Sequence, residues 1–483
     1  MGTRAWVVAV LLVAGACGKH HVGNGGDGGV DSNTADACTS LQCQQVDCAS
    51  KGLPPTTITG TVYAPNGTLP LYGVNVYVPF SDPGELSNEL KCDRCTDEVP
   101  GGAITLKTTD EAGAFTLPDV PATTNVPVVI QVGKWRRQLV IPAVAACQET
   151  KIDIVDTTLP KSVTDASPLT ALDATTHAPK VDLPRIAIST GAADALECLM
   201  LKLGIAPSEI TNDVGAGHVH LYTNNHAPGG QGAKQFQAGW PGGDGATFGD
   251  AETMWSDLPH LSAYDIVMFS CEGGQFPLTK PQSALEAVQQ YADLGGRVFM
   301  THWHNIWIGG EDGAQATHGI PTWETVATFN YAAPQDLEHA VASVDLTQNA
   351  KGASFSTWLT NVGASTTPGQ VPIDGARYTC STNDPANGGT SFLDVDPALP
   401  INSNHQSVQD LQFTTPVGAT ADQACGKVVF SDMHVASGSS SKATVPYPGP
   451  GAGSGCAQTD LSPQEKALAF IFFDISSCVG SIQ

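Results

Sequence analysis

The sequence predicts a multidomain protein in which an antiparallel β-sandwich is followed by an α/β domain of three layers. Short stretches of alternating apolar and polar residues, separated by turn signals, fill residues 56–156 and show no helical period. From residue 183 to residue 483, buried strands alternate with helical segments, which is typical of a parallel sheet covered on both faces. Residues 157–182 are rich in Thr, Ala, Pro and Asp and are predicted to be a linker.

The N-terminus, residues 1–17, has the features of an export signal. Arg4 precedes an apolar run that is shorter than the about 20 residues needed to span a bilayer. The run ends at Ala14-Gly15-Ala16-Cys17, which resembles the lipobox of bacterial lipoproteins, with Ala14 where Leu is usual. The resemblance implies lipidation of Cys17 and a place in the cell envelope. Gly18, where Asp would signal inner-membrane retention, favours the outer membrane. Secretion without an anchor is the alternative.

The composition limits the kinds of partner that the protein can bind and indicates its redox compartment. Residues 18–55 are predicted to be a flexible, cysteine-containing tether, because their Gly, Asp, Asn and Ser content buries little apolar surface. The net charge of -25 argues against nucleic acid as a partner. Of the 13 cysteines, twelve remain after Cys17, and this even number favours disulfides. Cys92 and Cys95 form a CxxC motif without the second pair that a zinc site needs.

The predicted sandwich carries a family pattern. Residues 60–76 read G-x-V-x-x-x-x-G-x-x-P-L-x-x-V-x-V, and residues 109–120 follow with a glycine, Phe115 and Leu117. This pattern resembles the carboxypeptidase regulatory-like, or transthyretin-like, domain. The resemblance implies an accessory domain at a surface, and some sandwiches of this shape bind glycans. The stretch Lys134–Arg137 could stack on a sugar, or it could belong to an ordinary strand with one solvated face.

The α/β domain is predicted from the period of its apolar residues. Buried strands are expected at residues 184–190, 264–271, 297–304 and 426–434. Helices are expected at residues 191–205, 280–296 and 461–478. The last helix should begin with Ser462 as its N-cap, Pro463 at its first position and Glu465 closing a capping box.

Three segments of this domain also carry a family pattern. Residues 264–267 lead into Ser270–Gly274, residues 295–299 lead to Thr301-His302, and residues 426–430 lead to His434. Together they resemble the class I glutamine amidotransferase-like fold, a flavodoxin-like three-layer architecture, and within it the ThuA-like branch. The resemblance is patchy between residues 308 and 423. The whole layout also resembles uncharacterised myxobacterial lipoproteins.

The reactive groups of that family are incomplete here. The resemblance implies a nucleophilic cysteine after the strand that here ends in Thr301, His302, Trp303 and His304. His434 lies in a place comparable to that of the family's base, but the acidic partner two residues later is replaced by Ala436. Glutamine hydrolysis by a Cys-His-Glu triad is therefore not expected.

Ligands of open parallel sheets bind beyond the carboxyl ends of the strands, and three such ends carry unusual side chains here. The candidate catalytic residues are His434 and Glu272 as an acid–base pair, with Cys271 as a nucleophile if a histidine activates it. The candidate metal ligands are His302, His304 and His434. The candidate ligand-binding residues are Trp303, Asn305, Trp307, Ser431 and Asp432.

The metal hypothesis depends on strand geometry. If the chain stays extended past Thr301, His302 and His304 share one face and can join His434 around a divalent metal. Imidazole suits Zn, Fe, Ni or Cu, and the sequence does not choose a cofactor. The alternatives are metal-free acid–base chemistry and a crevice floor of hydrogen-bonded polar side chains.

Three functions follow as hypotheses. The leading one is a lipoprotein, anchored through Cys17, that binds glycan or envelope polymer and carries an amidotransferase-like domain without its nucleophile. The second is a histidine-based hydrolase, with or without a metal, acting on a sugar or an amide. The third is a structural spacer of the envelope.

Overall fold

The computed structural model describes residues 40–312, 319–331, 337–396, 398–399, 407–435, 446–449, 456 and 460–480. The predicted signal peptide with Cys17, and the tether up to residue 39, lie outside the described residues and stay predictions. In the part of the chain that the structure describes, no helix combines the length and the apolar character needed to cross a bilayer.

Residues 56–182, called the β region below, include the predicted linker of residues 157–182 and form two sheets with the strand orders β3-β2-β5-β6-β8 and β4-β1-β7. The strands are β1 (Thr57–Thr61), β2 (Asn75–Pro79), β3 (Ala103–Thr108), β4 (Ala114–Leu117), β5 (Thr124–Val132), β6 (Trp135–Ala143), β7 (Glu149–Lys151) and β8 (Val181–Asp182). Pairing is antiparallel except between β1 and β7, which run parallel. The prediction of purely antiparallel pairing is wrong at this edge, because the long connection between β1 and β7 permits a crossover.

The β5–β6 hairpin brings the β region against the C-terminal helix. Val132 pairs with Trp135, so the turn consists of Gly133 and Lys134. Gly133 has a φ of 54°, and a Cβ atom there would lie 2.0 Å from the carbonyl oxygen of Ser476. Only glycine fits this close approach, since it tolerates positive φ and carries no Cβ. Trp135 packs edge-on against Phe472 of the same helix, with ring centroids 5.5 Å apart.

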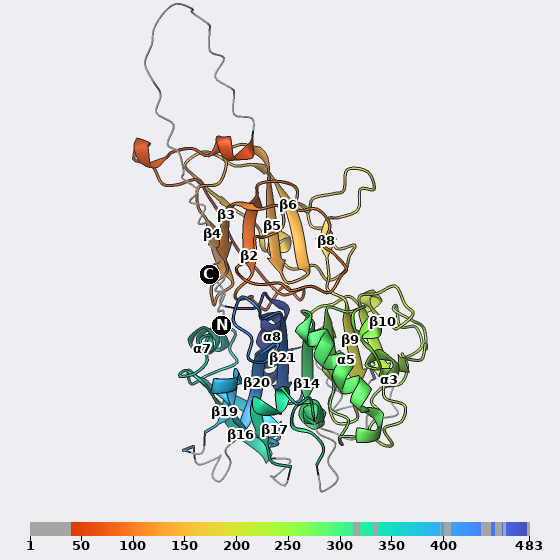
Figure 1. Cartoon of the computed structure of the whole chain (residues 1–483). Helices are drawn as coiled ribbons and strands as arrows, with labels where there is room; N and C mark the ends of the chain where they lie inside the picture. The colour runs from red at the N-terminus through yellow and green to blue at the C-terminus, as the bar shows by residue number, and fades with distance from the viewer. Residues whose placement is uncertain are drawn as a thin grey trace, which may run out of the picture. The chain divides into compact units, whose positions relative to one another are not determined.

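The remaining chain, called the α/β region (residues 183–480), is built on one sheet with the strand order β10-β11-β9-β13-β14-β21-β20-β19-β16-β17, in which β12 also pairs with β11 (Figure 1). Its strands are β9 (Ile186–Thr190), β10 (Ile210–Asn212), β11 (Val219–Thr223), β12 (Gly249–Asp250), β13 (Ile266–Phe269), β14 (Arg297–Thr301), β16 (Leu337–Val344), β17 (Gln370–Ala376), β19 (Thr390–Val395), β20 (Val408–Thr415) and β21 (Gly426–Ser431). A separate antiparallel pair is formed by β15 (Ala327–Phe329) and β18 (Cys380–Asn383).

The predicted parallel sheet is confirmed for half of this region only. The strands from β10 to β21 pair in parallel. The four strands beyond β21 pair antiparallel, so the complete sheet is mixed. These four strands come from the segment between β14 and β21, where the sequence shows no regular alternation of strand and helix. Antiparallel neighbours need no helical crossover, although the connection between β16 and β17 contains helix α7 (Gly352–Asn361).

The parallel strands face two separate cores, as expected for three layers. Met268 and Phe299 belong to the core that includes helix α8 and helix α2. Their chain neighbours Val267 and Val298 belong to the core that includes helix α5. Because side chains alternate between the faces of a strand, helices cover the sheet on both sides (Figure 1). The helices are α1 (Ile154–Thr157), α2 (Leu196–Lys202), α3 (Ala251–Met254), α4 (Leu258–Leu261), α5 (Gln282–Asp293), α6 (Ile306–Gly309), α7 (Gly352–Asn361) and α8 (Pro463–Ser476).

Local signals set the start of α8 as predicted. The backbone N–H of Glu465 donates to the Ser462 hydroxyl at 3.2 Å, and the Glu465 carboxylate accepts from the Ser462 backbone N–H at 2.8 Å. Pro463 fills the first helical position, where its missing N–H costs nothing. This reciprocal capping box fixes where the chain turns into the helix.

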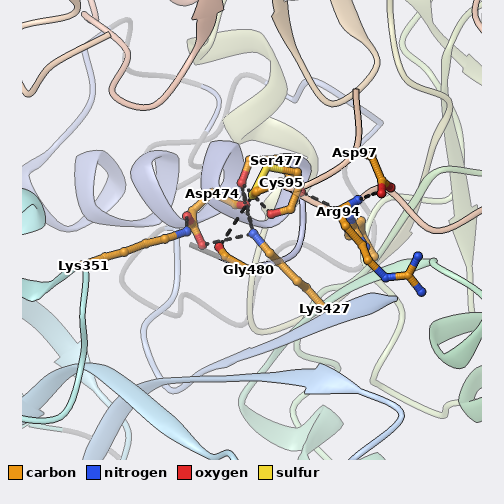
Figure 2. The surroundings of a disulfide bond; sticks show 10 residues. Arg94, Cys95, Asp97, Lys351, Lys427, Asp474, Ser477 and Gly480 are labelled. Atoms are coloured by element: carbon orange, nitrogen blue, oxygen red, sulfur yellow. Dashed lines mark hydrogen bonds and ion pairs between the residues drawn. A yellow bond between two sulfur atoms is a disulfide. The ribbon is translucent and has the colours of Figure 1, made fainter. Parts of the chain in front are cut away.

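Disulfides fasten the β region to the α/β region. Of the CxxC pair, Cys92 bonds to Cys425 and Cys95 bonds to Cys478, so the two do not bond to each other. Figure 2 shows Cys95 beside the end of α8, near the buried Lys427 and Asp474. Two further bonds join Cys48 to Cys147 and Cys198 to Cys456. The predicted use of cysteine in disulfides is thereby confirmed, although Cys271 and Cys380, among the described cysteines, form none.

Candidate functional site

Three strand ends meet at one edge of the parallel sheet. The chain leaves β13 towards Cys271, leaves β14 into His302, and leaves β21 towards His434. Since Met300 pairs with both Phe269 and Phe430, the three strands end at the same level of the sheet. The rings of His302 and His434 accordingly lie with their centroids 5.4 Å apart, although the residues are far apart in the sequence.

Cys271, His302 and His434, called the Cys-His-His cluster below, form a compact group of possible metal ligands. One thiol and two ring nitrogens lie within 4.8 Å of one another, and all three side chains are buried. The Sγ atom of Cys271 lies 3.3 Å from Nδ1 of His302. Burial raises the pKa of the Cys271 thiol to about 12, so the sulfur stays protonated at neutral pH unless a cation stands beside it.

The chain does not stay extended after β14, which corrects the predicted metal set. His302 has a φ of 40°, a left-handed conformation that non-glycine residues adopt rarely and at some cost in energy. Residues His302–Asn305 then form a 3-10 helix, so side chains no longer alternate. The ring of His304 packs against that of Phe269, with the two centroids 5.4 Å apart. Its Nδ1 accepts a hydrogen bond from the indole N–H of Trp307 at 3.0 Å, and it is not a member of the cluster.

Glu272 has a buried cationic partner. Its carboxylate is 2.8 Å from the ammonium of Lys280, and both side chains are fully buried. Its oxygen Oε2 also lies 4.0 Å from Nε2 of His304. The structure therefore pairs Glu272 with Lys280, and the acid–base pair of Glu272 with His434 stays a prediction.

The predicted ligand-binding residues divide into those beside the cluster and those held elsewhere. Trp303 is half-buried. The centroid of its ring lies 4.8 Å from the ring centroid of His302 and 6.5 Å from that of Tyr331. Asp432 is buried and accepts hydrogen bonds from the backbone N–H groups of Thr379 and Cys380. Three others face local partners: Asn305 accepts from Gln275, Ser431 accepts from the backbone N–H of Met433, and Trp307 is fully buried.

The aromatic surfaces expected to hold sugars are mostly buried. In the β region, Trp135 is 1% exposed, and Arg136 and Arg137 form ion pairs with Asp182 and Asp165. Trp135, Arg136 and Arg137 thus pack the interior and offer no open platform, while Lys134 is partly exposed in the turn. In the α/β region the buried tryptophans are Trp240, Trp255, Trp307, Trp323 and Trp358.

Two residues important for the geometry escaped the sequence analysis. Asp194 follows strand β9 at the same edge of the sheet and is fully buried. In the sequence its carboxylate follows a buried strand by a few positions, and the apolar period around it indicates only the start of a helix. Lys280 precedes helix α5, and nothing in the sequence marks it as the partner of Glu272.

Comparison with known proteins finds likeness only at the level of solved structures. No protein-family model and no curated protein matches this chain. A ThuA-like protein from Bacteroides uniformis is 10% identical and covers 64% of this chain and 94% of its own, with a TM-score of 0.30. A ThuA-like protein from Parabacteroides merdae is 10% identical, with coverages of 61% and 91% and a TM-score of 0.31. A cytoplasmic protein from Salmonella typhimurium is 12% identical, with coverages of 61% and 99% and a TM-score of 0.30. At such scores the site must be judged on its own residues.

Proposed function

We propose that the Cys-His-His cluster binds a divalent transition metal, with zinc as the best fit, and that the metal supports hydrolysis of a substrate. One observation carries this proposal: the ligand atoms of Cys271, His302 and His434 lie within 4.8 Å of one another. Ligands held at about 2.0–2.3 Å from one zinc ion stand about 3–4 Å from each other, so small side-chain adjustments suffice.

Among the residues that the structure describes, three side chains could hold the ion, and this number favours a catalytic over a purely structural ion. Structural zinc sites usually have four protein ligands, whereas catalytic sites have three and leave one position for water or substrate. A metal in such a site lowers the pKa of its bound water to about 7 and so supplies a nucleophile near neutral pH. Thiolate and imidazole together suit zinc better than magnesium or calcium, which prefer oxygen.

The surroundings favour a ring-bearing substrate such as a sugar. Trp303 directly follows His302, is half-buried, and stacks at 6.5 Å on Tyr331, which is half-buried as well. Aromatic rings that are partly exposed beside a polar centre offer an apolar face to a sugar ring. An amide substrate would use the same metal and would gain less from these rings.

Elemental analysis of the full chain, purified from its native envelope, tests the proposal. We expect one zinc ion per chain in the wild type and its loss in His434→Ala. His339→Ala is the matched control, because His339 is an exposed histidine that pairs with Asp374 away from the cluster. Metal-free wild-type protein whose melting temperature does not change with a chelator would contradict the proposal.

A second candidate function, binding of glycan or envelope polymer, is supported by a cavity beside the β region. The cavity has a volume of about 360 Å³, within the range of small-molecule sites. Its lining includes the polar side chains of Asn75, Arg94, Asp97, Glu98 and Gln131. Amide, carboxylate and guanidinium groups of this kind hydrogen-bond to sugar hydroxyls.

A glycan array and an envelope-polymer pull-down test this second candidate. Binding by the wild type that falls in Glu98→Ala and persists in Glu286→Ala would support it, because Glu286 is an exposed glutamate outside the cavity. Binding no stronger than that of the denatured chain would count against it.

A further inference from the structure

The turn that follows β9 forms hydrogen bonds with the loops of Cys271 and His434 and with the end of β14, just before His302. Asp194 lies in this turn and is fully buried. Its Oδ2 accepts a hydrogen bond from the hydroxyl of Thr301 at 2.9 Å, and Thr301 is the residue before His302. Its Oδ1 accepts from the backbone N–H of Val435 at 2.8 Å, and Val435 is the residue after His434.

Cys271 is tied to the same carboxylate through Thr301. The backbone N–H of Cys271 donates to the Thr301 hydroxyl at 2.9 Å, while that hydroxyl donates to Asp194. The turn also touches the Cys271 loop directly, since the backbone N–H of Ala193 donates to the carbonyl of Cys271 at 3.0 Å. Gly191 allows this approach, because a Cβ atom there would lie 2.1 Å from the Cys271 carbonyl oxygen.

We propose that Asp194 is the positioning residue of the Cys-His-His cluster, which it holds together through Thr301 and Val435. The inference rests on the proposed function, since it assigns to Asp194 the alignment of the three ligands of the same site. A carboxylate is suited to the task because its two oxygens accept several hydrogen bonds at once. Here they take donors from the last residue of β14 and from the loop after β21, and a neutral apolar residue could hold neither.

The zinc affinity of the full chain, measured by competition with a chromogenic chelator, tests the role of Asp194. Loss of a residue that orients metal ligands weakens binding by about 10–100-fold, which we expect for Asp194→Ala. Asp194→Asn keeps the shape and one acceptor oxygen and should lose less. Asp374→Ala, at an exposed aspartate, should bind as the wild type does. Unchanged affinity in Asp194→Ala would overturn the inference.

Milder variants keep the test decisive if Asp194→Ala does not fold. Thr301→Val removes the hydroxyl that links Asp194 to Cys271 and leaves the shape of the side chain nearly unchanged. Thr301→Ser retains the hydroxyl and should restore the zinc affinity that Thr301→Val loses. Equal affinities of the two Thr301 variants would count against positioning through this hydrogen bond.

A readout without metal separates this inference from the proposed function. In metal-free protein, alkylation of Cys271, followed by mass spectrometry of its peptide, reports how often its loop opens. We expect about tenfold faster alkylation of Cys271 in Asp194→Ala, and an unchanged rate at the buried Cys380 of the same chain. If the wild type binds no zinc and this difference is seen, the proposed function fails and the positioning stands. If the wild type binds zinc and the Asp194 variants change neither readout, the proposed function stands and the positioning role of Asp194 fails.

Discussion

The Sγ atom of Cys271 lies 3.3 Å from Nδ1 of His302, although 31 positions separate the two residues in the chain. Their strands are neighbours in the sheet, and both loops begin at the same edge. His302 has a left-handed backbone, with a φ of 40°, at the point where the strand ends and a 3-10 helix begins. This pair, completed by His434, is the basis for expecting a metal.

Cobalt substitution provides a spectroscopic check of the ligand set. If Cys271 ligates the ion, protein loaded with Co²⁺ should show a thiolate-to-cobalt charge-transfer band in the near ultraviolet, because the metal binds the deprotonated sulfur. The band should vanish in Cys271→Ser and persist in Cys380→Ser. An identical spectrum in Cys271→Ser would exclude sulfur ligation.

Asp474 should make the stability of the protein dependent on acidic pH. Burial alone would raise its pKa, but the nearby ammonium groups of Lys351 and Lys427 outweigh burial and lower the pKa to about 2 (Figure 2). A folded-state pKa below the unfolded value means that the stabilisation is complete above about pH 4 and is lost as pH falls towards 2. Asp474→Asn should therefore reduce the free energy of unfolding by about 2 kcal/mol at pH 7.

Chemical denaturation at pH 7 and at pH 2 measures this difference. Asp374→Asn, at an exposed position, serves as the control. The gap between Asp474→Asn and the wild type should shrink at the lower pH, and a gap that is equal at both pH values would argue against the charge effect.

The buried pair of Lys280 and Glu272 should be sensitive to the loss of one partner. Their charged atoms lie 2.8 Å apart and both side chains are fully buried. Lys280→Met leaves a buried carboxylate without its cation and should cost about 3–5 kcal/mol of unfolding free energy. The double variant Lys280→Met with Glu272→Gln should recover part of this loss. Additive losses in the double variant would show that the two side chains act independently.

The disulfide between Cys95 and Cys478 should contribute strongly to stability, since it closes a loop with a sequence separation of 383 residues. Replacing both cysteines with serine should lower the unfolding free energy by about 2–5 kcal/mol. The test compares the melting temperature of this double variant with that of Cys380→Ser, which breaks no disulfide. Equal melting temperatures would be inconsistent with a stabilising role.

Lipidation at Cys17 remains a prediction from the sequence alone. Cells fed a labelled fatty acid should incorporate the label into the wild-type chain, and Cys17→Ser should abolish the incorporation, because the lipid is attached to that sulfur. Cys38→Ser is the matched control in the same tether. Equal incorporation into Cys17→Ser and the wild type would place the lipid at another residue. No incorporation into either chain would show that the protein is not lipidated.

Sequence by itself determined those features that depend on local patterns. The period of apolar residues located strands β9, β13, β14 and β21 and helices α5 and α8, since burial on one or two faces leaves a readable repeat. The capping box of Ser462 and Glu465 was found because its two hydrogen bonds join residues three apart. The sequence placed Cys271, as a possible nucleophile, at the same edge as the possible metal ligands His302, His304 and His434, because the strand ends of a parallel sheet share one edge.

Only the tertiary structure decided which of those candidates meet. The left-handed backbone at His302 ended the strand earlier than expected and removed His304 from the metal set. Glu272 forms an ion pair with Lys280, a residue that the sequence did not connect with the site. Asp194 acquired its partners Thr301 and Val435 from distant parts of the chain. Such partners depend on backbone turns and on long-range packing, and neither leaves a period in the sequence.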